Sequence, residues 1–282
     1  MPTVTTNTAA NSALRFLNLN NKASESSVSK LASGSRIVKA ADDAAGLAIG
    51  TRLMADINVL RQAATNAAQG VTVMQVADGG LARIGDVLQR MKALAAQSLS
   101  GVPSDTERGF INAEFLQLVQ EINGMASTTR FNGASLLDTS SGQFSTAVNF
   151  FVGSEVGDNI TVNITTIATG VSTFTATGLG LSAASVSTAA LAASAMGLVD
   201  TAIDAISEGR ANVGAIGSRF TFREQQIATG LENLTAARSA IMDVDLAEEQ
   251  SKLVSSQVLV QASVSALSQA NQLPQALLAL LQ

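Results

Sequence analysis

The sequence predicts a mainly α-helical protein, built as a long antiparallel helical hairpin (a coiled-coil-like rod) with a small inserted β-rich outer module. Apolar residues recur at seven-residue spacing along two long stretches, which indicates sustained helical seams. The stretch between them, 139–187, has no Lys or Arg and is rich in β-branched residues and glycines. Helices of about 50 residues would each be about 75 Å long, so we expect a rod rather than a compact globule.

Two long stretches carry the helical seams. One apolar register runs from residue 57 to 95 and a second from 196 to 234. A seven-residue repeat keeps one apolar stripe turned toward a partner helix, so we expect the two stretches to pack against each other. The residues expected in this rod-domain seam are Ile57, Leu60, Met74, Leu81, Leu88, Val199, Ile206, Val213, Phe220, Ile227 and Leu234.

A shorter helix is expected after the first long stretch. Gly101 and Pro103 interrupt the heptad pattern there. Ser104 and Glu107 then have the spacing of a capping box, which predicts a new helix start. The apolar face expected for this helix consists of Ile111, Phe115, Leu118, Ile122 and Met125.

The middle of the chain is expected to be an outer module. Strand-like composition is confined to residues 144–152 and 160–167, and turn residues flank both runs. We therefore expect the module to be peripheral and dispensable for assembly. The expected division of the chain is a terminal core domain (1–41 and 240–282), a helical rod domain (42–138 and 188–239) and the variable outer β module (139–187).

Both ends of the chain lack charged residues. None occurs in 1–14 or in 253–282, and the C-terminal stretch continues a heptad pattern. Such ends need a covering partner or stay disordered, so we expect them to form a core only on assembly. The residues expected in this core-domain assembly seam are Leu14, Leu17, Val28, Leu31, Leu246, Leu253, Val260, Val264 and Leu267. The sequence shows no Sec-type signal and no apolar run of about 18 residues, so no membrane insertion is expected.

The composition argues against enzyme chemistry. The 282 residues include no Cys and no His, which excludes thiol nucleophiles, Ser-His pairs and disulfides, and removes the usual zinc ligands. Catalysis by carboxylates alone is unsupported rather than excluded. The net charge of −5 argues against a nucleic-acid binder, whose affinity would come from clustered Lys and Arg. We expect no enzyme activity, no catalytic residue, no cofactor and no metal site.

Several long motifs, in order along the chain, closely resemble bacterial flagellin, the subunit of the flagellar filament. The first is LASGSRIVKAADDAAGLAIGTRL at 31–53. Toward the other end stand RANVGAIGSRF at 210–220, AARSAIMDVDLAEEQSKL at 236–253 and QANQLPQALLALLQ at 269–282. The resemblance covers about residues 1–138 and 188–282, and it leaves the central module as the part that varies in the family.

The resemblance implies a structural subunit that self-assembles into the bacterial flagellar filament for swimming motility. It implies secretion to the extracellular filament, with export of the unfolded chain through the flagellar type III channel. The implied partners are other flagellin subunits, an export chaperone on the C-terminal segment, and the filament cap and hook-junction proteins, with no nucleic acid. Two alternatives are a hook-filament junction protein, which shares the terminal helices, and a surface module that binds a ligand through the central β region.

Asp42, Asp43 and Gly46 form a compact motif in the first matched stretch. Paired carboxylates could serve acid–base chemistry, but acids at this place also cap the start of a long helix and complement its dipole. The capping interpretation is favoured, and the resemblance implies that the segment is a hinge and an inter-subunit contact.

Arg90, Leu94 and Glu114 match positions at which flagellins are recognised by an innate immune receptor of animals. The resemblance therefore implies receptor contacts at these residues. The residues alone equally suit an ordinary role, with Arg90 and Glu114 as surface charges and Leu94 beside the seam.

Overall fold

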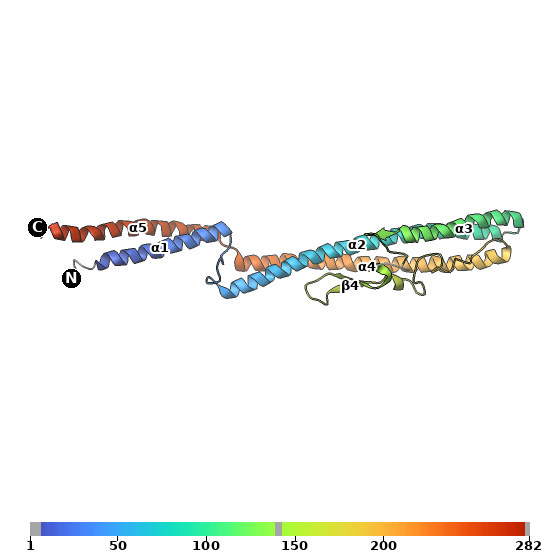
Figure 1. Ribbon diagram of the computed structural model, residues 1–282, viewed down its shortest axis with the longest axis horizontal. Helices are drawn as coiled ribbons and strands as arrows, with labels where there is room; N and C mark the ends of the chain where they lie inside the picture. Colours follow the sequence, from blue (N-terminus) through green and yellow to red (C-terminus); the bar gives the residue numbers. More distant parts are fainter. Residues whose placement is uncertain (1–6, 139–142, 280–282) are drawn as a thin grey trace. The chain divides into compact units, whose positions relative to one another are not determined.

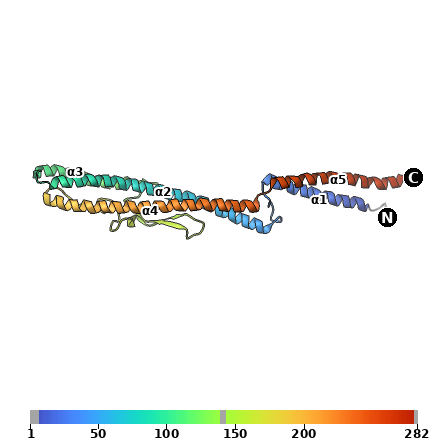
Figure 2. The ribbon, with the colours of Figure 1, turned by 180° about the vertical axis from the view of Figure 1, so that it is seen from behind.

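The computed structural model describes residues 7–138 and 143–279, so the remaining parts of the expected terminal and central segments lie outside it. Five helices dominate the described chain (Figure 1): α1 (Thr8–Ser33), α2 (Ala44–Leu99), α3 (Asp105–Thr128), α4 (Ala189–Met242) and α5 (Leu246–Ala279). Both views show α2 and α4 side by side, and α1 beside α5 (Figures 1 and 2). The predicted fold class, long helices with few and short strands, is confirmed.

Contacts divide the chain into two units, each formed by segments distant in the sequence. The terminal unit comprises Met1–Ile57 and Glu232–Gln282, and the middle unit comprises Asn58–Leu231. The sequence pattern placed the corresponding limits near residue 41, in the segment before α2, and near residue 240, in the last turn of α4. The difference arises because α2 and α4 are continuous helices that extend from one unit into the other.

The middle unit has a core of apolar side chains from α2, α3 and α4. Leu81, Leu88 and Met91 of α2 are fully buried together with Phe115 of α3 and Val199 of α4. The start of α3 follows its sequence prediction. Ser104 and Glu107 form a capping box, in which the Glu107 carboxylate accepts from the Ser104 backbone N–H at 2.7 Å.

The central segment contains one β-hairpin among its described residues. Strands β3 (Val148–Phe151) and β4 (Asn159–Val162) pair antiparallel, with Phe150 opposite Ile160. Short 3₁₀ turns, η1 (Gln143–Ser145) and η2 (Ile164–Thr166), flank the hairpin. The strands are shorter than the expected 144–152 and 160–167, because η1 takes up the start of the first run and η2 takes up the end of the second.

The expectation that this segment is peripheral is wrong for its packing. Its apolar side chains, including Phe174 and Val162, are buried in the same core as those of the long helices. Phe150 lies edge-on to Phe220 of α4, with ring centroids 5.3 Å apart. Four asparagines of the helices also bond its backbone, in the pairs Asn66 with Phe151 (3.0 Å), Asn212 with Ile167 (2.6 Å), Asn123 with Ala176 (2.9 Å) and Asn112 with Val186 (2.8 Å).

A second, tight hairpin follows α3 and was not predicted from the sequence. Strands β1 (Arg130–Phe131) and β2 (Ala134–Ser135) pair antiparallel through Asn132 and Gly133. Both linking residues have positive φ, 50° and 81°, as a two-residue primed turn requires. The Asn-Gly pair is the signal in the sequence that predicts such a turn.

Candidate functional site

The candidate site is the surface of the terminal unit, where α1 and α5 pack along one side of each other. The facing positions recur at heptad spacing, with Leu17 and Leu31 on α1 half-buried against α5. Two hydrogen bonds fix the register, from the Asn7 amide to the Ala270 carbonyl at 2.8 Å and from the Asn20 amide to the Ser263 hydroxyl at 3.3 Å. The facing residues of α5 include Leu253, Val260 and Leu267, which are also half-buried.

The expected core-domain assembly seam therefore separates into two sets. Five of its members face the partner helix of the same chain, as described above. The other four are between 46% and 60% exposed: Leu14, Val28 and Val264 lie beside the facing sides, and Leu246 is the first residue of α5. The heptad register found the periodic residues, but it did not show that α1 and α5 cover only one side of each other within a single chain.

Further large apolar side chains are exposed on the same two helices. Phe16 and Leu19 on α1 and Val254, Val258 and Leu259 on α5 are uncovered. From Leu253 to the end of the chain there is no charged residue, so this part of α5 lacks the charged face that is typical of a surface helix. Apolar residues exposed on both helices mark a protein interaction surface.

The segments that join the long helices pair with each other inside the terminal unit. Gly34 ends α1 in the left-handed conformation, with φ of 66°. The Arg36 backbone N–H donates to the Met242 carbonyl at 2.7 Å, and the Val244 N–H donates to the Gly34 carbonyl at 3.2 Å. The Ser35 hydroxyl adds a bond to the Met242 carbonyl at 3.0 Å. These bonds hold the end of α1 beside the end of α4.

Asp42 and Asp43 organise the start of α2. The Asp42 carboxylate accepts from the backbone N–H groups of Lys39 and Val38, and these two bonds lower the pKa of Asp42. The Asp43 carboxylate accepts from the Gly46 N–H at 2.9 Å, one turn into the helix. Asp43 thus caps the helix and Asp42 fixes the turn before it, which accounts for both acids without catalysis. A hinge or inter-subunit role for Asp42, Asp43 and Gly46 stays a prediction.

Gly46 has a packing reason in this turn. A Cβ at this position would lie 2.5 Å from an Asp43 carboxylate oxygen and 2.7 Å from Ile37. The turn before α2 therefore packs too closely against position 46 to admit a side chain there.

The residues expected in the rod-domain seam lie along the facing sides of α2 and α4. Leu60 and Leu234 are partly buried. The other nine are buried: Ile57, Met74, Leu81, Leu88, Val199, Ile206, Val213, Phe220 and Ile227. Among the described helices, α4 alone has a stretch long and apolar enough to span a membrane by length and composition. The burial of Val199, Ile206 and Val213 in the core accounts for part of that apolar character.

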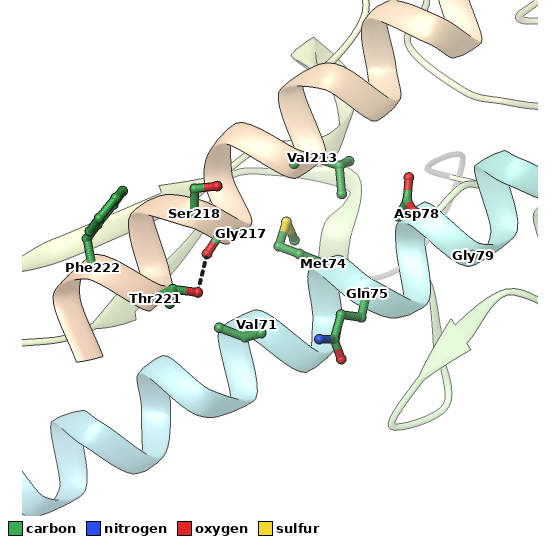
Figure 3. A pocket seen from close by; sticks show the side chains of 11 residues that line it. Val71, Met74, Gln75, Asp78, Gly79, Val213, Gly217, Ser218, Thr221 and Phe222 are labelled. Atoms are coloured by element: carbon green, nitrogen blue, oxygen red, sulfur yellow. Dashed lines mark hydrogen bonds between the residues drawn. The ribbon is translucent and has the colours of Figure 1, made fainter. Parts of the chain in front are cut away.

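A groove of about 500 Å³ lies between α2 and α4 in the middle unit. Figure 3 shows Met74 of α2 pointing toward Val213 and Gly217 of α4, whereas Phe222 points away from α2. Asp78 is the one titratable residue in the lining, and it is paired with Arg210 at 2.8 Å. With no second acid or base in the lining, the groove gives no support for acid–base catalysis.

The three residues implied as receptor contacts differ in exposure. The Arg90 guanidinium and the Glu114 carboxylate form an ion pair across α2 and α3, at 2.6 Å. Leu94 is 2% exposed and packs in the core. A receptor cannot reach Leu94 while these helices are packed, because the core covers its side chain, so only Arg90 and Glu114 remain as candidates.

Comparisons with known proteins cover almost the whole chain. Residues 4–141 match the bacterial flagellin N-terminal helical region, and residues 196–281 match the bacterial flagellin C-terminal helical region. The chain is 37% identical over 276 residues to a flagellin of Halalkalibacterium halodurans, with 98% of each protein covered. It is 35% identical over 289 residues to the flagellar filament core protein flaB2 of Brachyspira hyodysenteriae, with 99% of each covered. A crystal structure of Bacillus cereus flagellin is 26% identical, with a TM-score of 0.47 over 62% of this chain and 94% of that one.

Proposed function

This chain belongs to the bacterial flagellin family and is a structural subunit of the extracellular flagellar filament, and on that premise we propose that the exposed apolar residues of α1 and α5 drive its assembly. The family and the named relatives are filament proteins, and nothing in them favours a hook-filament junction protein. The family is a structural one.

One observation carries the proposal for α1 and α5. Each helix is covered by the other along a single side, and large apolar side chains on the remaining sides stay in contact with water. Removing apolar surface from water stabilises an assembly by about 25 cal/mol for each Å² buried. In a homopolymer, the α1 and α5 helices of neighbouring copies can bury these exposed side chains, because every copy has the same exposed apolar surface.

A pair of matched variants tests this assignment. Val258→Asp places a carboxylate on an exposed, apolar part of α5. It is expected to leave the monomer folded but to prevent polymerisation onto sheared filament seeds, because assembly would bury an unpaired charge. Val156→Asp makes the same change in the exposed loop of the β3–β4 hairpin and is expected to polymerise like the parent. Negative-stain microscopy and sedimentation measure the polymer, and a Val258→Asp chain that polymerises normally contradicts the proposal.

We also propose that the chain is exported unfolded through the flagellar type III channel, with its C-terminal segment held by an export chaperone. The filament cap and hook-junction proteins are the further partners proposed. Support comes from family membership and from the uncharged, partly uncovered end of the chain. A chain without residues 253–282 is expected not to be exported and to be degraded inside the cell. If the truncated chain accumulates intact inside the cell, the segment is not protected by a chaperone.

A further inference from the structure

The surface of helix α1 divides into sides of different chemistry. Successive residues of an α-helix are rotated by about 100° around its axis, so the side that faces α5 is given by its half-buried residues. These include Leu17, Ser24 and Leu31. The opposite side, which faces away from α5, carries the exposed residues Arg15 and Lys22.

One flank of α1 combines apolar residues with an acid. Leu14, Val28 and Glu25 lie on the same side of the α5-facing direction, at roughly 50° to 110° from it. All three are exposed. No basic residue of α1 shares this flank.

The other flank combines apolar residues with a base. Phe16, Leu19 and Lys30 lie on the opposite side of the α5-facing direction, at roughly 70° to 130° from it. Phe16 and Leu19 are exposed, and Lys30, in the last turn of α1, is half-buried. No acidic residue of α1 shares this flank, so the two flanks are alike in apolar character and opposite in charge.

Within one chain these two charges are not used in an ion pair. Neither Glu25 nor Lys30 takes part in any of the ion pairs found among the described residues. Lys30 has a weaker influence, since it contributes to lowering the pKa of Asp42. Helix α5 offers no partner beyond its first turns, because it carries no charge after Lys252.

We propose that neighbouring copies of this chain pack side by side through these two flanks, with Glu25 of one copy against Lys30 of the next. The inference rests on the proposed function and names the contact by which the terminal helices assemble. Two different but complementary patches on one helix make a heterologous contact, which continues from copy to copy instead of closing as a two-fold dimer. The opposite charges determine which flank meets which, because like charges would face each other in the alternatives.

The experiment mixes two variants that each repel themselves. Glu25→Lys puts a positive charge on both flanks, and Lys30→Glu puts a negative charge on both. In low salt, each variant alone is expected to need at least about a tenfold higher concentration than the parent to polymerise on seeds, since like charges then meet at every contact. An equimolar mixture is expected to polymerise near the parent concentration, because alternating copies restore opposite charges.

Lys22→Glu is the matched control, because Lys22 faces away from α5 and outside both flanks. This variant is expected to polymerise like the parent. Circular dichroism of each monomer checks that the helices are retained. Single variants that polymerise like the parent, or a mixture no better than its components, overturn the inference. Normal polymerisation of Val258→Asp would instead contradict the proposed function, so the two failures are distinguishable.

Discussion

At the scale of single residues, the ring of Phe220 illustrates how tightly the middle unit is packed. The ring lies edge-on to Phe150 and also covers Gly70 of α2. A Cβ at residue 70 would lie 2.5 to 2.7 Å from three atoms of that ring. Because Phe220 is fully buried, the ring has no open space into which it can move.

Gly70→Ala is therefore expected to destabilise the protein by about 1 to 3 kcal/mol, through overpacking of the core. Gly79→Ala is the matched control on the same helix, where an added Cβ meets nothing within 4 Å. That control is expected to stabilise the helix by about 0.5 to 1 kcal/mol, because alanine loses less backbone entropy than glycine. Thermal melts followed by circular dichroism measure both, and equal shifts in the two variants would contradict the packing described for Phe220.

Val260 lies on the side of α5 that faces α1 of its own chain, so a charge there acts before assembly. Val260→Asp is expected to weaken the α1–α5 pair in the monomer, because it places a carboxylate at a half-buried position without a base nearby. Val258→Asp, on an exposed side, is its control. Limited trypsin digestion should cut at Lys22 and Lys30 faster in Val260→Asp than in Val258→Asp. Equal cleavage rates would show that α1 and α5 do not pair in the monomer, which is what the lack of charged residues at both ends of the chain predicts.

Glu208 connects α4 to the central segment and makes that connection sensitive to acid. The Thr169 hydroxyl, at 2.7 Å, and then the Thr169 backbone N–H lower the pKa of Glu208 below its ordinary value of 4.5. A carboxyl with a lower pKa in the folded state contributes stability above about pH 4.5, and this is lost as the pH falls through its folded pKa.

Replacing this carboxylate tests the contribution. The Tm of Glu208→Gln is expected to lie below that of the parent at about pH 7. The difference in Tm is expected to narrow toward about pH 3, where the parent has also lost the charge. Glu121→Gln, an exposed position on α3, is the comparison and should follow the parent throughout. A Tm difference that stays the same from about pH 7 to about pH 3 would show that the charge of Glu208 does not strengthen its hydrogen bonds with Thr169.

At the scale of elements, the central segment completes the core of the middle unit. Excising residues 143–186 with a Gly-Ser bridge would remove Phe150 from the ring of Phe220, which is now fully buried. We expect this deletion to lower Tm by at least about 10 °C, because several kcal/mol of burial are lost. Replacing only the loop tip at 154–157 with Asn-Gly should change Tm little. A deletion that melts like the parent would restore the view that the segment is peripheral.

The positions of the long helices could be predicted from the seven-residue repeat, because nearly all the seam residues of α2 and α4 are buried along one side. The terminal helices show the limit of this signal. A heptad register identifies Leu14 and Leu17 equally well, yet only Leu17 faces α5. Which side is covered depends on the packing partner, and the repeat does not specify it. In the central segment, composition predicted strands, but burial against the helices is a long-range property that local pattern does not contain.

At the scale of the whole molecule, stability and assembly are linked through the terminal helices. A subunit bound on all its uncovered sides is stabilised by its neighbours according to mass action. We therefore expect purified filaments to dissociate at a temperature that rises with total subunit concentration. Sedimentation across a dilution series measures this dependence. A dissociation temperature independent of concentration would show that loss of filament is set by unfolding of the middle unit.

The inner side of the α1–α5 pair carries a further consequence. It holds Asn20, Ser27 and Ser263 among its leucines and valines, so two helices alone bury little apolar surface. Most of the stabilisation of the α1–α5 pair then comes from contacts with neighbouring subunits, as the order of a molecule in a crystal comes from its lattice contacts. The polymer accordingly has a solubility: its end exchanges subunits with a saturated solution, and the filament grows or dissolves according to whether the surrounding concentration lies above or below that value.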